Sequence, residues 1–145
     1  MQHRNWIHDA LLTSKGKGQC RELRDNFPDH ERISTVICSP LRRAVQTAAI
    51  SFAPAINREG VQFIAHPLGQ ESNAHKCDIG HTRTDLEGQL PELLADRDPA
   101  FALSKFDLSL VEDGWTSKVR SFCTLRQCSF LLLAVIVLIV FVLVV

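Results

Sequence analysis

Residues 33–48, with the sequence ISTVICSPLRRAVQTA, decide how this chain folds. The first six residues are a short β-branched run, which is typical of a strand buried on both faces of a parallel sheet. Ser39 and Pro40 interrupt that strand, and proline suits the first turn of a following helix. The helix has an apolar stripe at helical spacing, formed by Leu41, Ala44, Val45, Ala48, Ala49 and Phe52. A buried strand that leads into an amphipathic helix predicts an α/β fold.

Weaker patterns on either side extend this prediction. A helix is expected to begin after Thr13, whose hydroxyl can cap the first turn, and to end before Pro28. A short apolar run from Val61 to Ala65 predicts a second strand. Residues 84–95 and 98–105 have weak helical patterns. The order helix, strand, helix, strand, helix is typical of an α/β sandwich.

Charge and cysteine content exclude several classes of protein. The chain has 16 basic and 16 acidic residues, so no basic excess points to a nucleic-acid partner. Its five cysteines form no CxxC pair, which argues against a zinc site or a disulfide framework. We therefore expect no metal and no organic cofactor. The N-terminal residues lack the apolar core of a secretion signal, which favours a cytoplasmic domain.

Arg43 is the residue best placed for chemistry. It falls in the first turn of the helix after the strand at 33–38, where free amides and the helix dipole favour an anion. Its guanidinium adds a two-pronged donor that matches phosphate oxygens. The alternative is a solvated arginine at an exposed helix end, because arginine is a common surface residue.

Two motifs resemble those of a known family. Residues 39–48, SPLRRAVQTA, match every defined position of the S-x-L-x-R-A-x-Q-T-A signature of the histidine phosphatase (phosphoglycerate-mutase-like) superfamily. Residues 12–19, LTSKGKGQ, match the L-T-x-x-G-x-x-Q helix start of the same family. The resemblance implies a three-layer sandwich with parallel strands, hydrolysis of phosphomonoesters, and Arg43 as a phosphate-binding residue. A phosphorylated small molecule or a phosphate anion is the partner that it implies.

A looser match continues along the chain. Residues 66–71, HPLGQE, and 77–80, CDIG, resemble the family's L-x-E segment and a C-D-x-G extension of fungal members. The resemblance implies that Glu71 protonates the leaving group and that Asp78 lines the same pocket. The alternative for Glu71 is an ordinary loop carboxylate. Residues 106–115 resemble a late segment of the fungal members, so the likeness runs from about residue 8 to residue 117.

The family's nucleophile is missing from this sequence. In the family, the histidine of an Arg-His-Gly or Arg-His-Ala motif attacks phosphorus, and a second histidine lies in a later Thr-His-Gly segment. No Arg-His and no Thr-His dipeptide occurs here. Residues 1–117 are therefore expected to form an incomplete, inactive domain. The family places the two strands that carry these histidines at the centre of its sheet, so the strand at 33–38 is expected to have unpaired edges.

Residues 118–145 differ in composition from the rest of the chain. A basic collar (Lys118, Arg120 and Arg126) precedes sixteen apolar residues, FLLLAVIVLIVFVLVV, at 130–145. As a helix these would span about 24 Å, against about 30 Å for the hydrocarbon core of a membrane. An apolar C-terminal helix that anchors the chain to a membrane is the prediction. A pair of buried strands is one alternative; a shifted reading frame or a retained intron near Lys118 is another.

Overall fold

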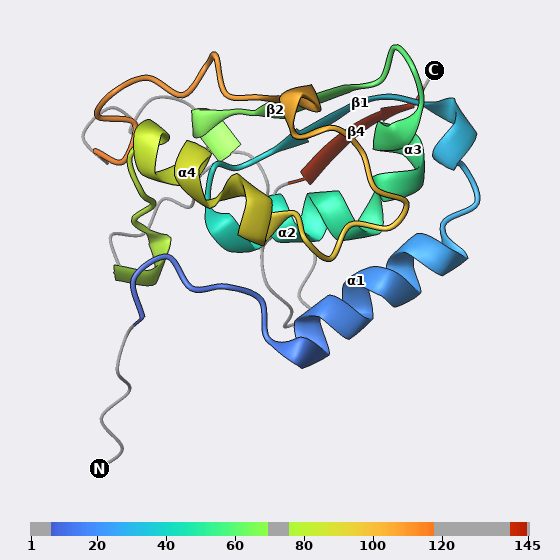
Figure 1. Cartoon of the computed structure of the whole chain (residues 1–145), viewed down its shortest axis with the longest axis horizontal. Helices are drawn as coiled ribbons and strands as arrows, with labels where there is room; N and C mark the ends of the chain where they lie inside the picture. The colour runs from blue at the N-terminus through green and yellow to red at the C-terminus, as the bar shows by residue number, and fades with distance from the viewer. Residues whose placement is uncertain (1–6, 70–75, 118–139, 145) are drawn as a thin grey trace, which may run out of the picture.

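The β-branched run is present as strand β1, Ile33–Cys38, inside a four-stranded sheet of order β3-β2-β1-β4. The structure, a computed structural model, describes residues 7–69, 76–117 and 140–144. The other strands are β2 at Gln62–Ala65, β3 at Phe106–Asp107 and β4 at Val140–Val144. β1 pairs in parallel with β2, and β2 pairs in parallel with β3 (Figure 1). Three neighbouring parallel strands among helices confirm the α/β class.

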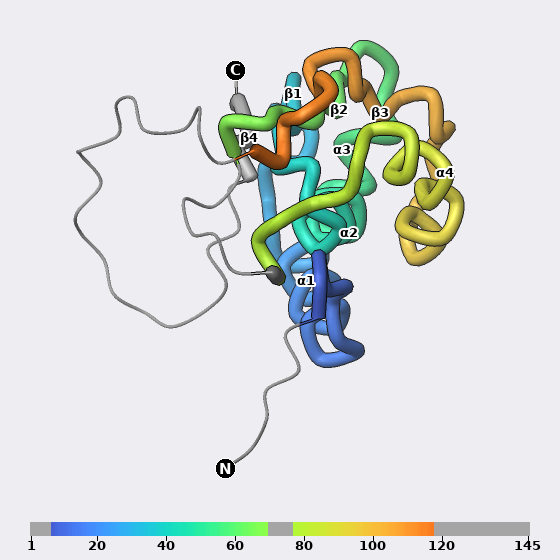
Figure 2. Tube along the Cα trace, turned by 90° about the vertical axis from the view of Figure 1, so that its left-hand side faces the viewer, coloured from blue at the N-terminus to red at the C-terminus, as the bar shows by residue number. Residues whose placement is uncertain are grey.

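The helices of the described residues gather on one side of this sheet (Figures 1 and 2). The α-helices are α1 at Ser14–Asn26, α2 at Arg42–Ser51, α3 at Ala53–Asn57 and α4 at Arg83–Leu93. Short 3-10 turns lie at His30–Arg32, Pro67–Gly69, Lys76–Asp78 and Leu103–Lys105. No helix in the described ranges is long and apolar enough to cross a membrane.

Burial alternates along the strands because the helices cover one face of the sheet. Val36, Cys38, Phe63 and Ala65 are buried, whereas Thr35, Ile37 and Ile64 between them are only partly buried. Alternation of this kind marks a sheet with one packed face. The prediction of a strand buried on both faces is therefore wrong for β1. The described residues form two layers, a sheet and a helical layer, of the three that the family resemblance implies.

Local sequence rules give most of the helices correctly. The hydroxyl of Thr13 caps α1 by accepting a hydrogen bond from the amide of Gly16 at 3.1 Å, and α1 ends before Pro28. The apolar stripe of α2 is buried along its whole length. The helix predicted at 98–105 is wrong, since a 3-10 turn there leads into β3.

The end of the apolar tail is a strand rather than a helix. β4 pairs antiparallel with β1, with Val142 opposite Val36. The expectation of unpaired edges at 33–38 is therefore wrong, because β2 and β4 occupy the two edges of β1. The helix predicted for the tail is not found at 140–144. The basic collar and the rest of the apolar run, at 118–139 and 145, lie outside the described residues.

A close contact fixes the segment after β3 against the turn at 76–80. The indole nitrogen of Trp115 donates a hydrogen bond to the carbonyl of His81 at 2.9 Å. A Cβ atom on the buried Gly80 would lie 2.3 Å from Cη2 of the Trp115 ring, which is far inside van der Waals contact. Only glycine fits between the turn and this ring.

Replacing Gly80 by alanine is expected to destabilise the domain by about 1–3 kcal/mol, because the new methyl group overpacks against Trp115. The matched control is Gly88→Ala in α4. Gly88 is exposed, has open space around its Cα, and lies in a helix, where alanine is favoured by up to about 1 kcal/mol. Denaturant unfolding of the two variants should give changes of opposite sign; equal changes would contradict the packing argument.

Candidate functional site

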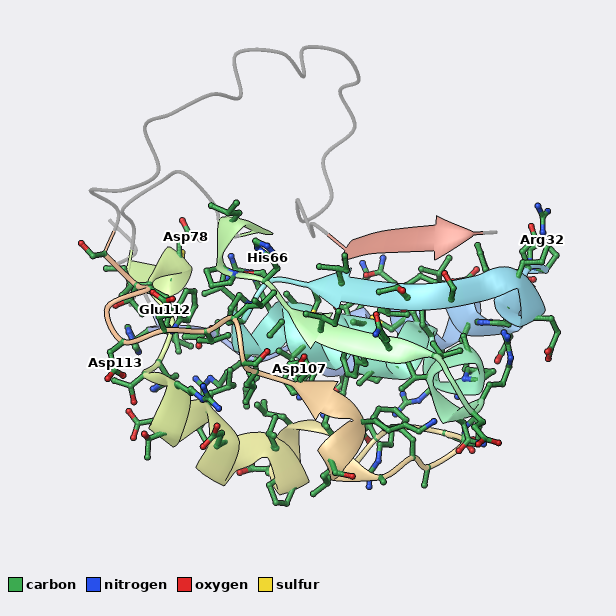
Figure 3. All side chains as sticks on the ribbon, turned by 90° about the horizontal axis from the view of Figure 1, so that it is seen from above. Arg32, His66, Asp78, Asp107, Glu112 and Asp113 are labelled. Atoms are coloured by element: carbon green, nitrogen blue, oxygen red, sulfur yellow. The ribbon has the colours of Figure 1, made fainter. Side chains whose placement is uncertain are left out.

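Arg43 and Asp78, two of the residues singled out by the sequence, meet near the carboxyl end of β1 and β2. Figure 3 shows Asp78 and His66 at the end of the sheet that lies opposite Arg32, the residue before β1. The amide of His66 donates to the carbonyl of Cys38 at 2.8 Å, so the two strands leave the sheet together. The buried Ser39 follows β1, and α2 begins three residues later. In open α/β sheets, ligands bind at this end of the strands.

Arg43, in the first turn of α2, reaches across to the turn at Lys76–Asp78. Its Nη2 donates to Oδ1 of Asp78 at 2.9 Å, and its Nη1 donates to the carbonyl oxygen of Cys77 at 2.6 Å. The Arg43 and Asp78 side chains are only 14% and 7% exposed. Water screens such a pair poorly, so the attraction between the two charges is stronger than in a surface ion pair. Thus the structure brings together two of the residues that the resemblance assigns to one pocket.

Glu71, the third of those residues, lies outside the described residues. The chain that leads to it is described as far as Gly69. A Cβ atom on Gly69 would lie 3.4 Å from the backbone nitrogen and Cα of Ser39. The turn at Pro67–Gly69 therefore packs against the start of the S-P-L-R-R segment, two residues before Glu71.

Arg42 forms a second ion pair that sequence reasoning missed. Its Nε donates to the carbonyl oxygen of Asp9 at 2.8 Å, its Nη1 donates to Oε1 of Gln89 at 3.1 Å, and its amide donates to Oδ1 of Asp9 at 3.0 Å. Asp9 is fully buried and has a positive φ of 42°. Aspartate tolerates this conformation better than most residues. A single aspartate before a predicted helix gives no sequence signal of such burial.

Burial raises the pKa of the Asp9 carboxyl, and it outweighs the opposing hydrogen bond and charge of Arg42. The geometry explains why: the guanidinium of Arg42 bonds mainly to the Asp9 carbonyl, and its Nε is 3.7 Å from Oδ2 of the carboxylate. That Oδ2 atom is buried without a hydrogen-bond partner. Asp9 therefore holds its segment against α2 through backbone groups more than through its charge.

His81 lies in the same region and packs edge-on against the ring of His8, with ring centroids 4.8 Å apart. Burial lowers the pKa of His81, and the charge of Arg42 adds to this effect. Its Nε2 is buried without a hydrogen-bond partner. His8 is exposed in a turn and His81 is partly buried in a loop, so the two rings meet at the surface of the domain. In the part of the chain that the structure describes, no group of three or more His, Cys, Asp or Glu side chains could hold a metal ion.

The lowered pKa of His81 predicts a loss of stability in acid. Folding disfavours the charged ring, so the contribution of His81 is fully present above its unfolded pKa of 6.5 and is lost as the pH falls towards the folded pKa. His81→Gln cannot be protonated in this range. Wild-type protein should lose more unfolding free energy than this variant between about pH 7.5 and about pH 5.5. Equal losses in the two proteins would contradict the role of His81.

Comparison with known proteins places this chain in a family. The sequence model of the histidine phosphatase superfamily (branch 1) matches residues 3–106, more than half of the chain. A protein of Schizosaccharomyces pombe named as a probable phosphatase is 34% identical over 86 residues, which are 58% of this chain and 39% of that protein. The chain thus spans well under two thirds of that relative. No solved structure matches. The chain belongs to the histidine phosphatase superfamily.

Proposed function

We propose that this domain binds the phosphoryl group of phosphomonoesters through Arg43, and that the chain by itself does not turn them over through a phosphohistidine. The observation that carries the first part is the place of Arg43. It lies in the family's signature, at the carboxyl end of a parallel strand and in the first turn of α2. The name of the yeast relative, a probable phosphatase, agrees with a phosphorylated ligand.

The chemistry of the site supports an anion. A guanidinium presents donors in a planar fork that suits two phosphate oxygens, and the amino end of α2 adds the positive end of a helix dipole. Arg43 is largely buried, so an anion beside it would be only weakly screened by salt. Glu71 is proposed as the acid near the leaving group. This is supported by the turn at Pro67–Gly69, which packs against Ser39 just before it.

The second part rests on the missing nucleophile. The phosphohistidine route needs a histidine that attacks phosphorus in line with the leaving group, and the family carries it directly after an arginine. This sequence has no such pair. Arg43 and a carboxylic acid can position a phosphomonoester, but they cannot form the covalent intermediate. We therefore propose that this chain is a non-catalytic domain that binds anions.

Inorganic phosphate is expected to bind with a Kd in the millimolar range, which corresponds to about 4 kcal/mol. Arg43→Ala and Arg43→Lys should both abolish binding, because an ammonium does not replace the fork of donors. The matched control is Arg32→Ala, which removes an exposed arginine at the opposite end of the sheet. NMR titration of each folded variant measures the loss; unchanged binding in Arg43→Ala would overturn the proposal.

Incubation with a labelled phosphomonoester tests the second part on the same proteins. No phosphohistidine should accumulate, and no turnover should exceed the background. Any turnover that disappears on replacement of a single histidine would show that a nucleophile is present. This result would contradict the proposal that the chain is inactive, but the proposal that Arg43 binds phosphate would still stand.

A membrane tether is a second candidate role, supported by the sixteen apolar residues at 130–145. Pairing of β4 with β1 competes with it, because residues 140–144 cannot form a sheet strand and a membrane helix at the same time. If β4 completes the sheet, deleting residues 140–145 should lower the unfolding midpoint and expose the edge of β1.

We expect the deletion of residues 140–145 to lower the stability of the domain, since β4 pairs along the whole of β1. Thermal unfolding of the full chain and of the deletion variant measures it. Flotation of the full chain with phospholipid vesicles, lost on deletion without any change in the unfolding midpoint, would instead support the tether.

A further inference from the structure

Arg43 and Asp78 place a strong donor next to a strong acceptor. Nη2 of Arg43 and Oδ1 of Asp78 are 2.9 Å apart, and the two side chains are 14% and 7% exposed. The backbone carbonyl of Cys77, the residue before Asp78, accepts from the same guanidinium. An anion that reaches Arg43 must therefore lie beside the carboxylate of Asp78.

This arrangement leaves the pair without net charge. The positive charge of Arg43 lies directly against the negative charge of Asp78. An anion that carries no hydrogen would meet the carboxylate of Asp78 with only repulsion. In a weakly solvated site, such repulsion is costly.

We propose that Asp78 is a specificity-determining residue, which together with Arg43 selects phosphoryl groups that keep a proton (inorganic phosphate, or a phosphomonoester in its singly protonated form) over fully deprotonated anions of the same shape. This inference rests on the proposed function of Arg43 as the phosphate-binding residue. A protonated phosphoryl group has a P–OH donor for the carboxylate of Asp78 and bare oxygens for the guanidinium of Arg43. Both buried groups are then satisfied by one ligand.

Sulfate is the probe that separates this role from simple charge pairing. Sulfate and phosphate are both tetrahedral and of nearly the same size. At neutral pH inorganic phosphate keeps at least one proton, whereas sulfate keeps none. A hydrogen bond to a charged acceptor changes affinity by about tenfold or more, so its absence in sulfate should be measurable.

The experiment is a titration of the full-length chain with inorganic phosphate and with sulfate at neutral pH. Wild-type protein is expected to bind phosphate at least about tenfold more tightly than sulfate. Asp78→Asn keeps an acceptor for Arg43 but removes the charge and adds an amide donor for sulfate, so the preference should disappear. Asp113→Asn, an exposed acid at the same end of the molecule, is the matched control and should keep the preference. Arg43→Ala should bind neither anion.

The possible results separate the role of Asp78 in selectivity from phosphate binding by Arg43. Equal affinity of the wild type for phosphate and sulfate, or a preference that survives Asp78→Asn, overturns the role of Asp78 and leaves phosphate binding by Arg43 standing. Binding of phosphate that persists in Arg43→Ala overturns both. Failure of all the folded proteins to bind either anion also overturns both. Circular dichroism shows which variants are folded, and Asp78→Glu, which keeps the charge, should keep the phosphate preference where Asp78→Asn loses it.

Discussion

The rest of the domain depends on two adjacent arginines that point to different parts of the chain. From the first turn of α2, Arg42 holds the segment at Asp9 and the α4 residue Gln89, while Arg43 holds the turn at Cys77 and Asp78. The first turn of α2 thus joins three other segments of the chain, at Asp9, at Cys77 and Asp78, and at Gln89. Removing one partner of such a buried pair leaves an uncompensated charge, which typically costs about 3–5 kcal/mol. The amino end of α2 is thus a structural joint as well as the proposed binding site.

This double role links stability to recognition. A phosphate-binding arginine in an open cleft would be satisfied mainly by water and ligand. Arg43 is instead satisfied in part by the protein itself, through a carboxylate and a backbone carbonyl. The turn at Lys76–Asp78 and the arginine hold each other in place, and the contact of Trp115 with Gly80 and His81 fixes the other end of this turn. A ligand at Arg43 would therefore meet a preorganised donor with an acidic neighbour.

The sequence predicts those parts of the fold that depend on local physics. The limits of β1, the cap at Thr13 and the buried stripe of α2 follow from β-propensity, capping chemistry and helical period. Gly80 and Asp9 could not be predicted, because their roles come from Trp115 and Arg42, more than thirty residues away in the chain. The site shows the same division: the family signature points to Arg43, but nothing in the spacing of Arg43 and Asp78 indicates that they form an ion pair.

β4 is the element that local reasoning could assign least well. Valine, leucine and phenylalanine suit a buried strand and a membrane helix equally, so composition alone cannot choose between them. The neighbouring strand β1 decides between strand and helix. The backbone amides and carbonyls along its apolar edge require hydrogen-bond partners. The two outer strands of the sheet differ in length and in charge. β3 is two residues long and ends in the charged Asp107, which blunts its edge, whereas β4 runs along the whole of β1 and has no charged residue. The tail forms a strand at 140–144 because β1 offers it a ladder of hydrogen bonds, which no pattern within the tail itself reveals.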